Sequence, residues 1–158
     1  MTCPICEKIK NKTNMVFEDD SVFAMLSDEP WSVGHILVIP KKHHSIIEQL
    51  PDDVIGKMFE VANKASMCAF EGLGAQGTNI LVQNGIPAGQ KTNHVMIHVI
   101  PRFENDDLDL SWTPKQASDD ALNEIEAKFK QEVAATPEET KPVEEKPAEE
   151  YRSIRRIP

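Results

Sequence analysis

The alternation of side chains over residues 93–100 constrains the fold most strongly. Every second position carries an aliphatic side chain, at Val95, Ile97 and Val99. The positions between them carry two imidazoles and a thioether, at His94, Met96 and His98. Because successive side chains of a strand point to opposite faces, one face is apolar and the other is not. The pattern predicts a sheet with one face on a hydrophobic core and the other forming the floor of a polar site.

Short apolar segments bounded by turn residues predict the other elements. Strands are expected at residues 15–18, 22–26, 34–40 and 79–83, a long helix at 52–72 and a shorter helix at 118–133. A hairpin thus comes first, followed by a helix and then by further strands. This order is typical of α+β proteins. We expect an α+β fold with an antiparallel sheet of about five strands, one long helix and one shorter helix.

The composition of the chain changes near residue 134, which divides it into three parts. Residues 1–133 are expected to form one domain. Glutamate and proline dominate residues 134–150, and such a segment buries too little apolar surface to offset its ordering entropy, so we expect a disordered acidic linker. Residues 151–158 form a basic peptide. Two interpretations of this peptide stay open: a frayed terminus, or a segment that docks on the domain or on a partner.

Charge and hydropathy exclude several classes of protein. The net charge of −9 is opposite to that of a nucleic-acid-binding surface. There is no apolar run long enough to span a membrane, and the N-terminus lacks the basic and apolar regions of a secretory signal. The expected location is the cytoplasm, with no nucleic-acid or membrane partner.

A glycine-containing loop at residues 84–92 directly precedes the alternating strand. Its glycines allow close approach of the backbone to a ligand, and their amides can bind an anion. Gln90 and Thr92 add side-chain donors, and Lys91 adds a cation. The position of this loop before the histidine-bearing strand predicts contacts with a phosphate group.

Two segments resemble the histidine-triad (HIT) family of nucleotide-binding proteins. Residues 88–102 contain Ala-Gly-Gln, a short gap, the alternating strand and then Pro-Arg, as in the family signature. Residues 26–43 resemble a second stretch, with Gly-His before an apolar strand that ends in Pro-Lys-Lys-His. The resemblance covers roughly residues 3–112 and implies a HIT-like fold and a homodimer that binds nucleoside phosphates, usually purine.

The resemblance also implies a chemical role for the middle of the triad. In the family the middle histidine attacks the α-phosphate and forms a nucleotidyl intermediate, and here that position is Met96. If His94 or His98 were taken as the middle histidine of the triad, the segment that ends in Pro101-Arg102 would no longer align with the end of the family signature. A thioether is a weak acceptor with no dissociable proton, so it cannot replace an imidazole as the nucleophile.

Three functional hypotheses follow, and the enzymatic assignment stays open. The first is a nucleotide-binding sensor or regulatory module without a covalent nucleophile. The second is a nucleoside-phosphate hydrolase that uses His98 and water, and the third is a scaffold. The nucleotide contacts expected from the loop and the resemblance are Asp28, His35, Asn84, Gly89, Gln90, Thr92, Met96 and His98.

The N-terminal Cys-Pro-Ile-Cys segment predicts a metal site. Two cysteines and two histidines make a tetrahedral zinc set, and some microbial members of the family are similar in carrying one. Carried over by resemblance, the ligands are Cys3, Cys6, His43 and His94. His44 is an alternative to His43, and a redox or untethered cysteine pair is the alternative to zinc. A closed set of four ligands is structural.

Overall fold

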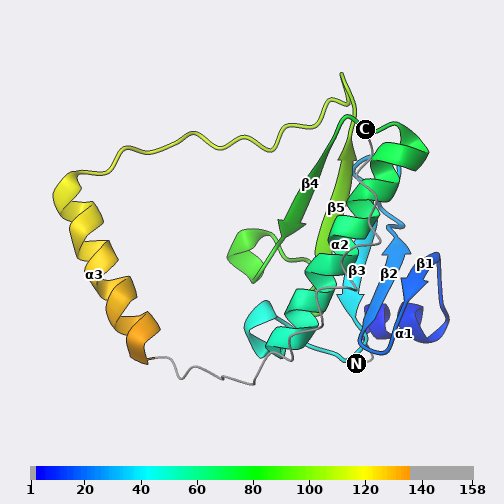
Figure 1. Cartoon of the computed structure of the whole chain (residues 1–158), viewed down its shortest axis with the longest axis horizontal. Coiled ribbons are helices and arrows are strands. Elements are labelled where there is room, and N and C mark those ends of the chain that lie inside the picture. The colour runs from blue at the N-terminus through cyan, green and yellow to red at the C-terminus, as the bar shows by residue number, and fades with distance from the viewer. Residues whose placement is uncertain (1–2, 136–158) are drawn as a thin grey trace, which may run out of the picture. The chain divides into compact units, whose positions relative to one another are not determined.

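A five-stranded antiparallel sheet in the order β1-β2-β3-β5-β4 carries the candidate site (Figure 1). The computed structural model describes residues 3–135. The strands are β1 Met15–Glu18, β2 Val22–Leu26, β3 Ile36–Pro40, β4 Gly77–Val82 and β5 Ile97–Arg102. The helices are α1 Pro4–Lys10, α2 Asp52–Leu73 and α3 Asp119–Ala135, with short 3-10 helices at Ile47–Gln49 and Ile86–Ala88. The predicted fold class, α+β with a five-stranded antiparallel sheet, is confirmed.

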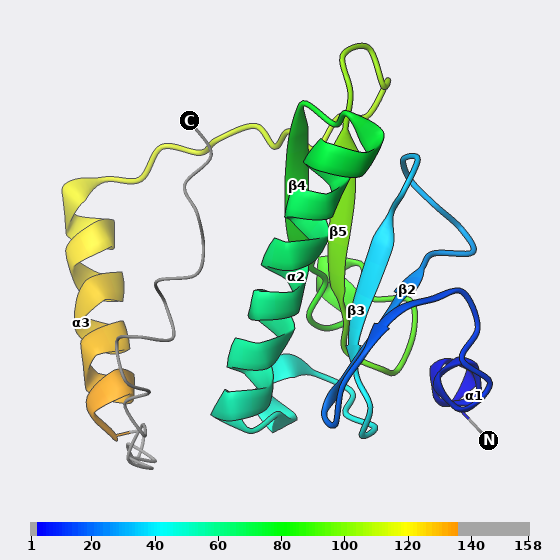
Figure 2. The ribbon, with the colours of Figure 1, turned by 45° about the vertical axis from the view of Figure 1, so that its right-hand side comes forward.

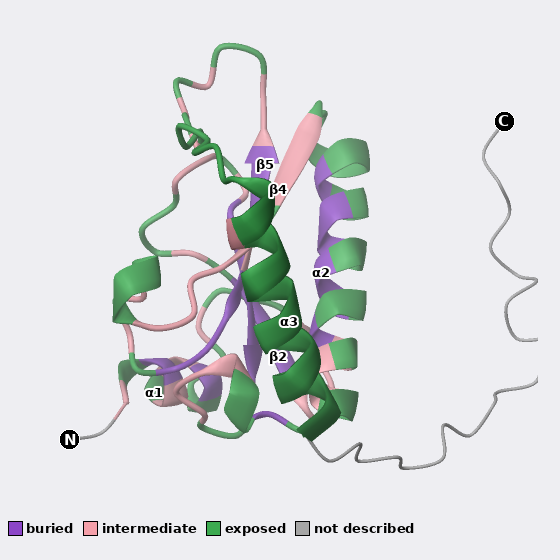
Figure 3. Ribbon diagram, turned by 90° about the vertical axis from the view of Figure 1, so that its left-hand side faces the viewer, coloured by how far each residue is buried: buried purple, intermediate pink, exposed green. Residues whose placement is uncertain are grey.

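The long helix α2 covers one face of the sheet (Figure 2). It follows Pro51, carries Asp52 in its first turn and ends before Gly74, which has the positive φ of 68° common at helix C-termini. Figure 3 shows that its buried residues form one stripe along the helix. This stripe packs against the apolar face of the sheet, which includes Val95, Ile97 and Val99.

The opposite face of the sheet carries the short helix α1 (Figure 2). Ile5 and Ile9 of this helix are buried against side chains from β2 and β3 and against Met96. Helix α1 was not predicted from the sequence, because seven residues make at most two turns and such a helix is marginal without tertiary contacts. Burial of its two isoleucines supplies those contacts.

The last strand is shorter than predicted. The sequence predicted a strand over residues 93–100, but β5 begins at Ile97, where both neighbouring strands also end their pairing, at Val38 and Val82. Before Ile97 the amide of Val95 donates instead to the carbonyl of His44, at 2.8 Å. The alternation nevertheless continues into this segment, since Val95 packs on the α2 side and Met96 on the α1 side.

The chain divides into two compact units, one ending at Leu110 and the other beginning at Ser111. The second unit contains α3, which extends the predicted helix by two residues and is capped by the Ser118 hydroxyl. The expected linker from residue 136 onward and the basic peptide at 151–158 lie outside the described residues. Within residues 3–135, no helix has the length and hydropathy needed to cross a membrane.

Candidate functional site

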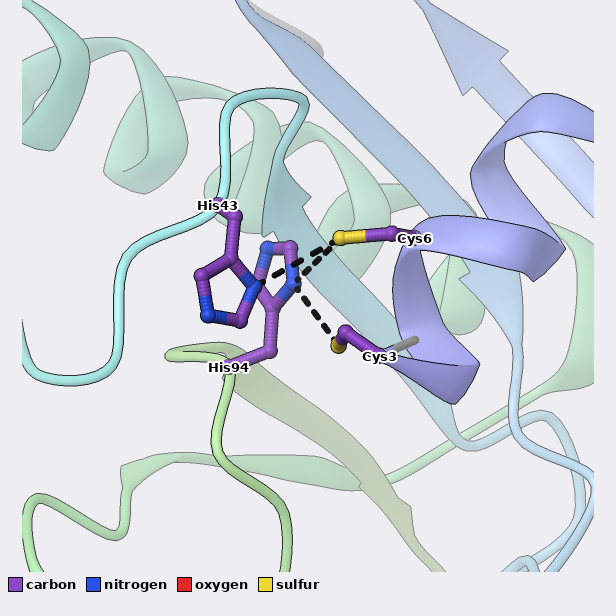
Figure 4. A group of neighbouring side chains, drawn as sticks. All are labelled: Cys3, Cys6, His43 and His94. Carbon is purple, nitrogen blue, oxygen red and sulfur yellow. Dashed lines mark hydrogen bonds between the residues drawn. The ribbon is translucent and has the colours of Figure 1, made fainter. Parts of the chain in front are cut away.

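Four candidate metal ligands meet beside the sheet, as Figure 4 shows. Cys3 and Cys6 lie at the start of α1, His43 lies in the turn after β3, and His94 precedes β5. Their ligand atoms all lie within 4.8 Å of one another. The structure therefore brings together the complete set that the sequence predicted, and His44 is not part of the group.

The distances within this group fit a tetrahedral metal ion. The Sγ atom of Cys6 lies 3.5 Å from Nδ1 of His43 and 3.6 Å from Nδ1 of His94. The Sγ atom of Cys3 lies 3.6 Å from the same His94 nitrogen. A tetrahedral zinc ion with bonds of about 2.3 Å to sulfur and about 2.0 Å to nitrogen separates these atoms by about 3.6 Å. These three distances fit a tetrahedral site, and the group could hold a metal ion.

A hydrogen bond fixes the orientation of the fully buried His94. Its Nε2 atom lies 3.0 Å from the carbonyl oxygen of Pro40. Because a carbonyl only accepts, Nε2 carries the proton and Nδ1 directs its lone pair at the two thiols. Burial lowers the pKa of His94, the bond to Pro40 partly opposes this, and the nearby His43 and His44 lower it further. The neutral form is the one that binds metals.

A cavity of about 260 Å³ opens beside the metal-ligand group. This volume is close to the lower end of small-molecule pockets, roughly 300–1,000 Å³. The predicted contacts that line it are Asp28, His35, Gln90, Thr92, Met96 and His98. The polar floor expected on one face of the last strand is therefore present, with Met96 between His94 and His98.

Two histidines and a tryptophan form one stacked group in the cavity wall. Nε2 of His35 lies 3.1 Å from Nδ1 of His98. The Trp31 ring stacks on His98 at a centroid distance of 4.8 Å and an interplanar angle of 12°. Burial lowers the pKa of His98 to about 4, and burial together with the neighbouring His98 lowers the pKa of His35 to about 4. Both rings are therefore neutral near pH 7.

Two predicted nucleotide contacts, Asn84 and Gly89, do not line the cavity. The Asn84 side chain accepts from the amide of Ile47 and donates to Glu48, so it joins this loop to a 3-10 helix. Gly89 has a φ of 89°, and a Cβ there would approach Gln83 Nε2 to 2.6 Å. Both positions maintain the shape of the loop.

Two further predicted contacts line the cavity with side chains that already have partners. The Gln90 amide donates to the carbonyls of Ser45 and Thr92 and accepts from the amide of Gly85. The carboxylate of Asp28 is paired with Lys8 and accepts from Asn14. Contact between either group and a ligand would have to compete with these bonds.

Lys8, Ser27 and Trp31 are among the cavity residues that were not predicted from the sequence. Lys8 was not predicted because it lies in helix α1, which was itself not predicted. Ser27 and Trp31 lie inside the segment at 26–43 that was singled out for its other residues. The bulky Trp31 in a polar loop was the available signal, because an aromatic ring between Pro30 and Gly34 needs an apolar surface to cover.

Comparison with known proteins identifies the same region. The family model described as HIT domain matches residues 8–105. A HIT-like protein of Methanocaldococcus jannaschii is 39% identical over 106 residues, which cover 66% of this chain and 81% of that protein. An adenylylsulfatase of Arabidopsis thaliana is 32% identical over 142 residues, covering 87% and 72%. A zinc-bound histidine triad family protein from Mycobacterium smegmatis has a TM-score of 0.65 at 29% identity, covering 86% and 99%.

Proposed function

The chain belongs to the HIT domain family, and on this premise we propose that it binds a purine nucleoside phosphate as a sensor or regulatory module. It does so without a covalent nucleophile. The adenylyl group in the name of the Arabidopsis relative supports a nucleotide as the ligand. The cavity offers a ligand the neutral His98 ring, the Thr92 side chain and the cation of Lys91.

Met96 is the observation that carries the proposal. It lies in the cavity floor at the position that the family resemblance assigns to the nucleophile. Its thioether cannot form a nucleotidyl intermediate at phosphorus. Only 9% of the residue is exposed, and it packs with Phe23, Met25 and Leu37. Met96 thus contributes to the core while leaving room for a ligand above it.

We infer that Cys3, Cys6, His43 and His94 would hold a zinc ion. Two thiolates and two imidazoles are a typical zinc set, and the mycobacterial relative is zinc-bound. Four protein ligands leave no open coordination position, so zinc would supply structural stability. Its role would be to fasten α1 to the turn after β3 and to the segment before β5.

We also propose a homodimer and a cytoplasmic location. Phe59 and Phe70 of α2 are 43% and 46% exposed, and Ile80 on the edge strand β4 is 44% exposed. An unpaired strand edge beside apolar side chains favours association with a second copy. None of the three cysteines forms a disulfide, which suits a reducing compartment.

The charge of the chain and of its C-terminal peptide indicates which macromolecular partners to expect. A net charge of −9 argues against a nucleic-acid partner. The basic peptide at 151–158 is proposed to dock on the domain or on a protein partner, because its charge is opposite to that of the preceding segment.

A thermal-shift series with AMP, ADP and GMP, followed by a turnover assay, tests the function. A ligand that binds only the folded state at about 100 times its Kd stabilises the protein by about 2.7 kcal/mol, so the melting temperature should rise. Met96→His should gain turnover of an adenosine phosphoramidate, and Met96→Leu, the matched apolar control, should gain none. No shift with any nucleotide, or turnover by the unmodified chain, would contradict the proposal.

A further inference from the structure

Helix α1 takes part in both the metal-ligand group and the cavity. The two cysteines at its start belong to the group of four donors (Figure 4). Three other residues of the same helix line the cavity, namely Pro4, Ile5 and Lys8. His94 is shared directly, because it is a candidate metal ligand and also lines the cavity. Any displacement of α1 therefore changes the metal-ligand group and the cavity wall together.

The contacts that hold α1 on the sheet differ in strength. The helix has seven residues, and a helix of this length is marginal without tertiary contacts. Ile5 and Ile9 are buried against the sheet, and Lys8 forms an ion pair with Asp28. The two side chains of this pair are 33% and 39% exposed, so its contribution to stability is small. The four metal donors are a further anchor of α1, and this anchor depends on a bound ion.

The larger core of the domain is independent of α1. This core lies between α2 and the opposite face of the sheet and includes Val38, Val61 and Ile97. Within residues 3–135, it contains no residue of α1 and none of the four metal donors. Domains open locally where few buried contacts hold a segment. We therefore expect α2 and the strands to stay folded without a bound ion, while α1 moves away from the sheet more readily.

A second connection runs from the metal-ligand group to the glycine-containing loop. The turn after β3 contains the candidate ligand His43 and also Ser45, whose carbonyl accepts from the Gln90 side chain at 2.7 Å. Between them, the carbonyl of His44 accepts from the amide of Val95 at 2.8 Å. Gln90 lines the cavity. The four donors are thus joined to the cavity through this turn as well as through α1.

We propose that metal binding and ligand binding are positively coupled, mainly through α1, so that the cavity is complete only when the four donors hold an ion. The inference rests on the proposed function and adds a condition to it: the chain binds its nucleotide tightly only where zinc is available. Coupling between two sites is reciprocal, so a ligand in the cavity raises the affinity for the ion by the same factor. Such factors are typically about 5–150, and we expect about tenfold.

Equilibrium titrations measure this coupling in both directions. Calorimetry gives the affinity for AMP of the zinc-loaded chain and of the chain stripped of zinc by a chelator. A competing zinc indicator gives the affinity for zinc with and without saturating AMP, and a titration of the indicator with AMP alone corrects for zinc bound by the nucleotide. We expect about tenfold in each direction. Equal affinities for AMP with and without zinc would overturn the inference.

Hydrogen exchange identifies the part of the chain that responds to the ion, and it needs no nucleotide. Removal of zinc should speed exchange of the α1 amides and leave α2 protected. Unchanged protection of α1 would overturn the inference. An equal loss of protection in α2 would also overturn it, because the ion would then hold the whole domain rather than one wall. The expected exchange together with no AMP binding by the zinc-loaded chain would refute the nucleotide function and leave the metal-dependent wall intact.

Two matched variants separate the effect of α1 from general stability. Ile9 is buried on α1 without lining the cavity, and Val61 is buried on α2. Ile9→Ala should weaken AMP binding by the zinc-free chain about a further tenfold, because α1 is held less firmly, and should leave the zinc-loaded chain nearly unchanged. Val61→Ala should leave the coupling factor unchanged. Equal effects of the two variants on this factor would overturn the inference, and if Ile9→Ala does not fold, the titrations and the exchange of the unmodified chain decide.

Discussion

Acidification from about pH 7 to about pH 5 will destabilise the domain through His35 and His98. Burial lowers the pKa of each ring from 6.5 to about 4, and the neighbouring His98 adds to the effect on His35. Between these pKa values the unfolded chain binds more protons than the folded chain. The contribution of the two rings to stability is therefore complete above about pH 6.5 and is lost as the pH falls toward 4.

The magnitude follows from the two pKa values. For one imidazole with a pKa of 6.5 when unfolded and about 4 when folded, the loss between pH 7 and pH 5 is about 2 kcal/mol. His35 is 2% exposed, so the full value applies to it. His98 is partly exposed, so solvent screening reduces its contribution to this loss of stability. We expect a combined loss of about 3 kcal/mol in the free energy of unfolding.

Urea unfolding at several pH values, followed by tryptophan fluorescence, measures this loss. The matched variant is His35→Gln/His98→Gln, which keeps polar side chains at both positions and removes the titration. Its stability should fall by about 3 kcal/mol less than that of the unmodified chain over the same pH range. An equal fall in both proteins would refute the reasoning, because the pH dependence would then arise elsewhere.

Further substitutions test the metal site and the loop. Replacing both Cys3 and Cys6 by serine should abolish bound zinc in elemental analysis and lower the melting temperature. The control Cys68→Ser, which replaces an exposed thiol outside the group, should change neither the zinc content nor the melting temperature. Stoichiometric zinc in the double variant would exclude this site. Gly89→Ala should cost about 1–3 kcal/mol in urea unfolding, because φ is 89° and the added Cβ would meet a side-chain amide. Gly56→Ala, with open space around its Cβ in a helix, should instead stabilise by about 0.5–1 kcal/mol, and equal effects of the two changes would contradict this account.

The hairpin and the long helix were predictable because local chemistry specifies them. The β1–β2 hairpin has its predicted bounds, since the Asp19 side chain accepts from the amides of Ser21 and Val22 and closes the turn. The candidate ligand set came from the family resemblance, which supplied His43 and His94 as the two donors that a Cys-x-x-Cys pair still needs. For the hairpin and the long helix, the residue types alone restrict the structure to few alternatives.

Other features depend on tertiary partners that no local pattern specifies. Asn84 was expected at the ligand, but its amide is taken by Glu48 and by the backbone of Ile47. A glycine-containing loop shows that polar groups are present, and only the fold shows which of them are used internally. The stacking of Trp31 on His98 joins segments 67 residues apart (31 and 98), and for the same reason it could not be predicted.

The central claim is that the cavity binds a nucleotide without turning it over. Phosphorus-31 NMR of adenosine 5′-phosphoramidate mixed with the zinc-loaded chain reports both events in one spectrum. We predict that the phosphorus signal shifts or broadens on addition of protein and that no AMP signal appears over time. Growth of an AMP signal in proportion to protein concentration would contradict the absence of a nucleophile at Met96, and an unchanged spectrum would contradict nucleotide binding.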